Sequence, residues 1–160
     1  MKKSTVAQTG LAVTAAAVSA SMASTHWRDD WYSALRKPAF LPPSWAFPVT
    51  WTSIYTDIAV TSAQAIDSLR DAGRDAEARR YVAALGFNLT LNAAWSWLFF
   101  RFNKLGPSAL GAGLLTASSA DLARRTVRAN PRAGLAMSAY PLWCVFATTL
   151  STQVWRLNRR

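Results

Sequence analysis

The chain has 160 residues, of which 51% are apolar or aromatic, and its 18 Lys and Arg against 8 Asp and Glu give a net charge of +10. This length supports one domain, and the apolar fraction excludes a disordered tail or a collagen-like fibre. A single cysteine, Cys144, and a single histidine, His26, exclude an intrachain disulfide framework, a CxxC metal site and a histidine-based zinc centre.

The charged residues gather in short clusters, and five long stretches between them are almost free of charge. These stretches cover residues 4–25, 38–66, 81–100, 105–123 and 133–155, interrupted only by Asp57 and Asp121. About 20 helical residues cross a hydrocarbon layer of about 30 Å, so five transmembrane helices fit. Because the basic residues lie between apolar spans and form no single face, we do not expect nucleic-acid binding. A soluble helical bundle with long core helices is the alternative that length and hydropathy favour less.

We therefore predict one all-α membrane domain over residues 1–160, a bundle of five transmembrane helices with a structured Pro/Trp-rich first loop. The approximate spans are 5–25, 45–66, 81–102, 105–123 and 133–155, and the lid loop covers 26–44. The first stretch follows Lys2 and Lys3 and is rich in Ala, so on local pattern it also fits a cleaved signal peptide. Small-xxx-small pairs such as Ala109 with Gly113 allow close helix packing and permit a homodimer without requiring one.

The first connection is far more aromatic than a plain linker. It holds Trp27, Trp31, Tyr32, Phe40, Trp45 and Phe47. Pro38, Pro42 and Pro43 fix the backbone and make the loop stiff. The aromatic rings suit a belt at the membrane interface, and the stiff loop equally suits a folded lid over a cavity.

The third stretch carries two carboxamides and two aromatic rings on one helical face. Asn88 and Asn92 are one turn apart, and Trp95 and Phe99 continue the same face. In hydrocarbon the carboxamides must face the bundle interior or a cavity. They form interhelical hydrogen bonds, or the polar anchor of a site for a large apolar ligand, or both.

The second and fifth stretches carry further aromatic stripes. Trp51 lies on the first of these, and Tyr140 and Trp143 lie on the second. Pro141 removes one backbone hydrogen bond, so we expect a bend that widens the space beside Trp143. Asp57 lies just off its stripe, and an ionisable residue within a span is a functional candidate unless a polar partner makes it structural.

Three blocks of this sequence carry a specific family pattern. They are WYxxLxKPxxxPPxWxFPxxWTxxY from Trp31, NxxxNxxWxxxFF from Asn88 and YxxWxxFATxL from Tyr140. In order and spacing they resemble the translocator protein family (TspO/MBR), also called tryptophan-rich sensory proteins or peripheral-type benzodiazepine receptors, in its bacterial form. The resemblance implies five transmembrane helices, a retained first helix and a ligand cavity closed by the first loop.

The resemblance also implies a function in an integral, multi-pass membrane protein, most simply of the bacterial cell membrane. Such a protein binds porphyrins and other hydrophobic ligands in an intramembrane cavity, with a sensing, regulatory or transport role in tetrapyrrole metabolism and stress response. No cofactor is required; the expected ligand is protoporphyrin or a related haem-pathway intermediate, and membrane lipid is the expected surrounding partner. The family's ligand-binding positions correspond here to Trp31, Tyr32, Pro42, Trp51, Asn88, Asn92, Trp95, Trp143 and Ala147.

Light-dependent porphyrin degradation is the alternative function, because some relatives are reported to perform it and Trp51 and Trp143 match the tryptophans implicated there. The chain has no Ser/His/Asp set, no paired carboxylates within a span and no phosphate-binding glycine loop, so hydrolytic chemistry is not expected. The chain departs from the family where Ala139 replaces a proline before Tyr140 and the proline is displaced to Pro141. No Lys or Arg follows Tyr140 within five residues, so the weak cholesterol pattern is not met and we do not predict sterol recognition.

Overall fold

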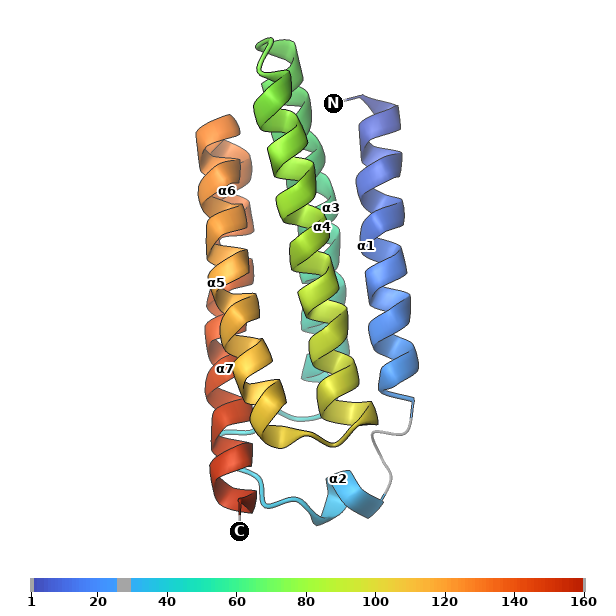
Figure 1. Ribbon diagram of the computed structural model, residues 1–160, viewed down its shortest axis with the longest axis vertical. Coiled ribbons are helices and arrows are strands. Elements are labelled where there is room, and N and C mark those ends of the chain that lie inside the picture. Colours follow the sequence, from blue (N-terminus) through green and yellow to red (C-terminus); the bar gives the residue numbers. More distant parts are fainter. Residues whose placement is uncertain (1, 26–29, 160) are drawn as a thin grey trace.

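The computed structural model describes residues 2–25 and 30–159, and within them all regular structure is helical. The elements are α1 (Lys3–Ala23), α2 (Asp30–Ala34), α3 (Ala46–Asp71), α4 (Asp75–Ser96), η1 (Trp97–Arg101), α5 (Leu105–Ala129), α6 (Pro131–Met137) and α7 (Ala139–Asn158). Because η1 continues α4 and α6 continues into α7, the described residues form five long helical segments and the short α2 (Figure 1). The predicted all-α bundle is confirmed.

The five segments run along one long axis, with α1 at one side, α3 and α4 in the middle, and α5, α6 and α7 at the other side (Figure 1). The turn between α3 and α4 lies at the same end as the N-terminus, and α2 lies at the opposite end with the C-terminus. The α1 helix packs on α3, α4 and η1, whereas α5 packs most extensively on α7. The backbones of α3 and α7 approach one another at few positions, so side chains must fill the space between them.

Local capping determines where the helices end. Gly73 adopts a left-handed φ of 69° after α3, and the Arg74 N–H donates to the carbonyl of Leu69 at 2.8 Å. This is the Schellman arrangement, in which glycine satisfies the last carbonyls of a helix. Between α5 and α6, Asn130 accepts a hydrogen bond from the Ala133 N–H at 3.2 Å, and proline follows at the first helical position.

These caps lie outside the predicted spans, and the helices are correspondingly longer than those spans. The α3 helix continues to Asp71 beyond residue 66, α4 begins at Asp75 before residue 81, and α5 continues to Ala129 beyond residue 123. A charged residue disfavours burial in hydrocarbon but does not interrupt a helix, so charge-free stretches underestimate helix length. Of the predicted lid loop, residues 26–29, including Trp27, lie outside the described residues.

Polar residues occupy much of the interior, and large apolar residues lie on the outside. Asn88 and Thr126 are fully buried, whereas Leu110 and Leu135 are 75% and 76% exposed. Other exposed apolar side chains are Leu11, Val18, Leu114 and Leu142. A bundle in lipid exposes apolar side chains to hydrocarbon and places small and polar residues between its helices. The distribution is therefore typical of a membrane bundle.

Length and hydropathy alone identify fewer spans than the charge pattern does. Among the described residues, Lys3–Ala23 and Pro131–Asn158 are both long and apolar enough to cross a membrane, each with a mean hydropathy of 1.3. The other three long segments have the length, but their Ser, Thr, Asn and Gly residues lower their hydropathy. Two such helices are weak support for a membrane location, so hydropathy alone does not place this chain in a membrane.

Candidate ligand site

Six aromatic side chains fill the space between α3 and α7 near the end of the bundle that carries α2. This α3–α7 aromatic cluster consists of Phe40, Phe47, Trp51, Tyr55, Trp143 and Phe146. Trp51 and Trp143 meet edge to face, with ring centroids 6.3 Å apart and planes at 86°. Phe40 comes from the first loop and Phe47 from the first turn of α3, and Phe47 lies 6.2 Å from Trp143. The predicted pair of tryptophans is thus brought together at the α3–α7 gap.

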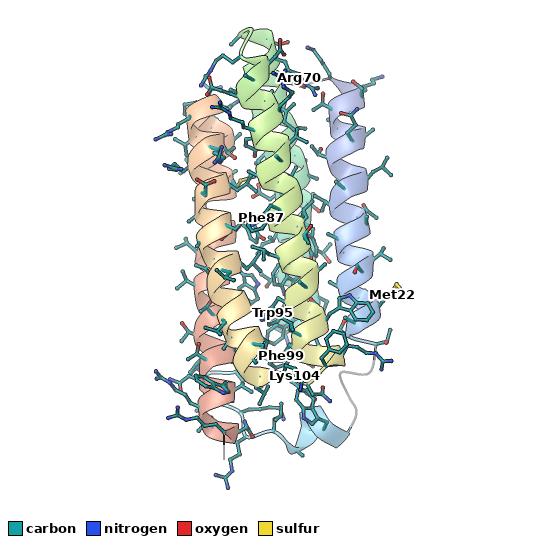
Figure 2. The ribbon with its side chains drawn as sticks, viewed as in Figure 1. Met22, Arg70, Phe87, Trp95, Phe99 and Lys104 are labelled. Carbon is teal, nitrogen blue, oxygen red and sulfur yellow. The ribbon has the colours of Figure 1, made fainter. Side chains whose placement is uncertain are left out.

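A second group of rings joins the first loop to the end of α4. This lid cluster consists of Trp31, Tyr32, Trp95, Phe99 and Phe100. Trp95 stacks on Phe99 at 5.6 Å, and both residues lie near the α2 end of the bundle (Figure 2). Trp31 contacts Phe99 edge to face at 6.1 Å. The short helix α2 is therefore seated on the bundle by aromatic contacts.

The π-helical turn η1 explains why two consecutive phenylalanines serve the lid cluster. In a regular α-helix Trp95 and Phe99 share a face, and Phe100 points elsewhere. The wider π-helical turn brings the side chain five residues on back towards the same face, and such turns are frequent at functional sites. Phe100 accordingly lies 6.1 Å from Trp95 and 6.3 Å from Tyr32.

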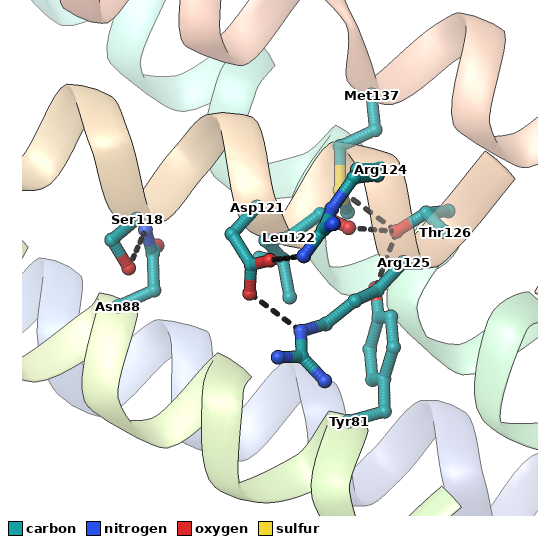
Figure 3. A network of polar contacts seen from close by, with 9 residues as sticks. All are labelled: Tyr81, Asn88, Ser118, Asp121, Leu122, Arg124, Arg125, Thr126 and Met137. Atoms are coloured by element: carbon teal, nitrogen blue, oxygen red, sulfur yellow. Dashed lines mark hydrogen bonds and ion pairs between the residues drawn. The ribbon is translucent and has the colours of Figure 1, made fainter. Parts of the chain in front are cut away.

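A chain of hydrogen bonds crosses the bundle beside these rings. The Tyr55 hydroxyl donates to Asn92 Oδ1 at 2.8 Å, and Asn92 Nδ2 donates to the Tyr140 hydroxyl at 3.2 Å. Tyr140 in turn donates to Asn88 Oδ1 at 2.8 Å, and Asn88 Nδ2 donates to Ser118 Oγ at 3.1 Å (Figure 3). This polar chain links α3, α4, α5 and α7. The two buried carboxamides thus form interhelical hydrogen bonds, one of the two roles expected of them.

Two buried indole N–H groups have no hydrogen-bond partner among the described residues. They belong to Trp95 of the lid cluster and Trp143 of the α3–α7 aromatic cluster. Leaving a buried donor unpaired costs about 1–3 kcal/mol, so native proteins rarely keep such groups without a reason. A ligand with hydrogen-bond acceptors would satisfy both donors.

The first loop is fastened to the last turn of α7. Arg36 donates its backbone N–H to Asn158 Oδ1 at 2.9 Å, and Asn158 Nδ2 donates to the Arg36 carbonyl at 2.9 Å. The ammonium of Lys37 lies over the Tyr32 ring, 4.7 Å from its centroid. This latch, formed by Asn158 and the Arg36 backbone, confirms the structured first loop. Neither residue of the latch was among the predicted site residues.

The other two predicted residues, Pro42 and Ala147, belong to neither aromatic cluster nor to the polar chain. Pro42 and Ala147 are half-buried, on the loop and on α7. Among the described residues, one groove lies between α4 and α5 and another lies near Arg70 and Arg79, and none of the nine predicted residues lines either of them. The five aromatic residues among the nine instead contact other aromatic rings, and Trp51 and Trp143 contact each other. The helices α6 and α7 are divided at Ser138, three residues before Pro141, and the wider space expected beside Trp143 stays a prediction.

Asp57 remains distinct from these contacts. It is half-buried on α3, and its Oδ2 atom is buried without a hydrogen-bond partner among the described residues. Among the described residues, this oxygen therefore has no polar neighbour that would explain Asp57 as a structural residue. It takes no part in the polar chain of Tyr55, Asn92, Tyr140, Asn88 and Ser118.

Comparison with known proteins identifies the family. The sequence pattern of the TspO/MBR family matches residues 8–156. The chain belongs to the TspO/MBR family. Similar proteins include Protein CrtK of Rhodobacter capsulatus, 30% identical over 80% of this chain and 78% of that protein, and the Translocator protein of Sus scrofa, 30% identical over 81% and 75%. The Tryptophan-rich protein TspO of Archaeoglobus fulgidus is 30% identical over 92% of this chain and 93% of its own length.

Membership of the TspO/MBR family places the chain in a membrane, which the hydropathy of its helices alone does not establish. Members of this family are membrane proteins with a helical-bundle fold, so this chain is a membrane protein as predicted. The match begins inside α1, which packs on α3, α4 and η1 as part of the bundle. The family resemblance noted from the three sequence blocks is confirmed.

Proposed function

We propose that this TspO/MBR protein spans a bacterial membrane with its five long segments and binds a porphyrin, or a similarly flat hydrophobic molecule, beneath the first loop. The site is the region bounded by Trp51, Trp95 and Trp143. The observation that supports it most is the pair of buried, unpartnered indole N–H groups, one in each aromatic cluster. A tetrapyrrole offers a wide aromatic face for the rings and polar edges for these donors.

The residues present suit such a ligand on energetic grounds. Each favourable ring pair contributes about 0.5–1.5 kcal/mol beyond the area that it buries, and both clusters supply several rings. Because the rings now fill the space between α3 and α7 themselves, they must separate for a ligand to enter. The sparse backbone contact between these two helices makes such separation less costly there than elsewhere in the bundle.

The lid provides the polar end of the site. Porphyrin propionates carry negative charge, and Arg36 and Lys37 lie in the loop above the aromatic clusters. A ligand that displaces rings under α2 would move the loop against the latch to Asn158. Coupling of ligand binding to loop position is the kind of change that a sensing, regulatory or transport role requires.

Binding is tested by titrating the detergent-purified protein with protoporphyrin in darkness while tryptophan fluorescence and porphyrin absorbance are followed. We expect saturable quenching. Trp143→Phe removes one unpartnered N–H but keeps an aromatic ring, so affinity should fall about two- to tenfold, the value of one hydrogen bond. Trp155→Phe is the matched control, because Trp155 belongs to neither cluster and contacts Arg159 instead. Equal affinity in all three proteins would contradict the proposed site.

Light-dependent porphyrin degradation is a second candidate function, supported by the close edge-to-face pair of Trp51 and Trp143. In such a reaction the excited porphyrin is oxidised and dioxygen is the oxidant that is reduced. Illumination of the complex should bleach the porphyrin absorbance in the presence of dioxygen and leave it unchanged without dioxygen. Bleaching that persists at the same rate in Trp51→Phe/Trp143→Phe would show that these residues do not carry the reaction.

A further inference from the structure

A groove of about 280 Å³ lies on the outside of the bundle between α4 and α5. It is lined by Ala84, Phe87, Leu91, Leu114, Ala117, Ser118 and Asp121. Phe87, labelled in Figure 2, and Leu114 are 62% and 61% exposed, so the groove opens towards the surroundings of the bundle. It contains none of the residues of the candidate ligand site. In a membrane protein an open apolar groove on this face borders lipid.

Both walls of the groove lead to arginines at the same end. On α4, Arg80 precedes Ala84 by one turn and so continues the face that carries Phe87. On α5, Arg124 and Arg128 follow Asp121 by about one and two turns. The Tyr81–Thr126 and Asn88–Ser118 hydrogen bonds, at 2.7 and 3.1 Å, hold the two antiparallel helices in register.

The charges at this end do not cancel. Asp121 forms ion pairs with Arg124 and Arg125 (Figure 3). Glu77 pairs with Arg74 at 2.7 Å. Among the described residues Arg80 and Arg128 form no ion pair, and both side chains are exposed.

The Tyr81–Thr126 hydrogen bond joins α4 and α5 one residue after Arg80 and two residues before Arg128, so the two arginines lie at the same level of the bundle. The hydrogen bond from Arg74 is the largest cause that lowers the pKa of Glu77, and the charges of Arg80 and Arg128 lower this pKa further. Two guanidinium groups without an ion pair among the described residues thus lie on neighbouring helices, about one turn beyond Ala84 and two turns beyond Asp121 of the groove. Guanidinium groups bind phosphate with two parallel hydrogen bonds, so this is suitable chemistry for a lipid phosphate.

We propose that the α4–α5 groove binds an anionic phospholipid, with an acyl chain along Phe87, Leu91 and Leu114 and the phosphate at Arg80 and Arg128. The groove runs about 10 Å along α4 from Leu91 to Ala84, at about 1.5 Å per residue, towards the charged end. The arginines lie outside the predicted spans, at the depth where headgroups occur, and basic pockets between helices are known to take anionic headgroups. An apolar channel that ends in unpaired cations is complementary to a lipid with an anionic head.

A second copy of the chain fits the same surface less well. The protein has 18 Lys and Arg but only 8 Asp and Glu, so another copy offers few carboxylates to meet the two arginines. An anionic lipid provides the missing negative charge together with the apolar chain. A second copy at this groove is therefore an outcome of the test that would overturn the proposal.

The test is native mass spectrometry of the detergent-purified full chain with phosphatidylglycerol or phosphatidylcholine of identical acyl chains. We expect phosphatidylglycerol to be retained preferentially. The variant R80Q/R128Q should lose about fivefold in affinity for each arginine, with phosphatidylcholine binding unchanged. The control R70Q/R79Q removes the same charge at the same end of the bundle but away from the groove, so it should keep the preference.

Two more variants keep the test decisive if R80Q/R128Q folds poorly. R80K/R128K retains the charge without the paired donors, so the preference should weaken but persist. Ala117→Phe places a ring in the groove and should lower the retention of both lipids. The proposal is overturned if the two lipids bind equally, if R70Q/R79Q loses as much preference as R80Q/R128Q, or if Ala117→Phe leaves lipid binding unchanged while it abolishes a dimer. None of these results depends on porphyrin binding.

Discussion

The two ends of the bundle are built on different principles. At the end with the α3–α4 turn, backbones approach closely, α3 ends in a Schellman arrangement and buried polar groups are paired, as in the Tyr81–Thr126 hydrogen bond and the contact of Thr126 with the Met137 sulfur. At the end that carries α2, bulky rings separate α3 from α7, and two indole N–H groups have no hydrogen-bond partner within the part of the chain that the structure describes. Close backbone packing allows little movement, whereas ring packing allows rearrangement without loss of the fold. The comparison indicates a rigid end that holds the bundle and an adaptable end, where we propose that the ligand binds.

The rigid end should be the most sensitive to added volume. A Cβ atom on Gly134 would overlap Val127 Cγ2 and lie 2.5 Å from Val127 Cα, so α5 and α6 would have to move apart. We expect Gly134→Ala to destabilise the protein by about 3 kcal/mol, the upper range for overpacking. Thermal unfolding in detergent measures the effect. Gly113→Ala is the control, because nothing lies within 4 Å of its added methyl group, and it should leave stability unchanged or slightly raised.

The polar chain between the two ends should be the next most sensitive element. Tyr140→Phe leaves Asn88 Oδ1 and Asn92 Nδ2 buried without partners, at a cost of about 1–3 kcal/mol. Tyr55→Phe removes a single bond to Asn92 and should cost less. Chemical unfolding of both variants, compared with Thr90→Ala on the exposed face, measures the order. An equal cost for all three would show that the polar chain contributes nothing special to stability.

Part of the fold and of the candidate site can be predicted from the sequence alone. Membrane-spanning helices need about 20 residues with few charges, so the five segments could be placed from the charge pattern. Helical periodicity put Asn88, Asn92, Trp95 and Phe99 on one face, and the structure confirms the burial of both carboxamides and the stacking of the two rings. Such patterns are local, and local patterns are what a sequence expresses directly.

The rest depends on contacts between distant parts of the chain. Nothing near Asn158 indicates that it binds the backbone of Arg36, because the pair is 122 residues apart in the sequence. The π-helical turn at Trp97–Arg101 has no distinct periodicity over so short a length. The partners of the carboxamides, Tyr55 and Tyr140, lie on the predicted aromatic stripes. Which groups their hydroxyls bind depends on how the helices pack together, and the sequence does not show this.

A carboxylate at the rigid end should make stability depend on pH. Asp67 is 4% exposed, and although burial alone would raise its pKa, hydrogen bonds from the Thr5 hydroxyl at 2.7 Å and the Lys2 backbone N–H lower this pKa below its ordinary value. Because the folded-state pKa is the lower one, the stabilisation is complete above the unfolded-state pKa of about 3.9 and is lost as the pH falls through the folded-state value. We expect about 1.5 kcal/mol, the low end for hydrogen bonds to a charged group.

The Asp67→Asn variant provides the comparison. Its unfolding free energy should be lower than that of the native chain at pH 7 and should change less between pH 5 and pH 3, about one unit either side of the unfolded-state pKa. Thermal unfolding at a series of pH values in one detergent measures both effects. If the native chain and the variant lose stability in parallel, Asp67 is not the group that fastens the start of α1 to α3.

The adaptable end offers the smallest and most specific effect, at the latch between the lid and α7. Asn158→Ala removes both hydrogen bonds to the Arg36 backbone, so the lid should open more often. The bound porphyrin should then dissociate about two- to tenfold faster, as for the loss of one net hydrogen bond or slightly more.

Arg36→Ala is the matched control, because it deletes the side chain but keeps the N–H and C=O groups that Asn158 binds. Stopped-flow displacement of protoporphyrin measures the dissociation rate, and global stability should stay nearly constant because the latch is exposed. Since the lid acts on the path to the site rather than on the ring contacts, the association rate should rise together with the dissociation rate. Faster dissociation with an unchanged association rate, and so a weaker equilibrium affinity, would place Asn158 in the binding surface itself.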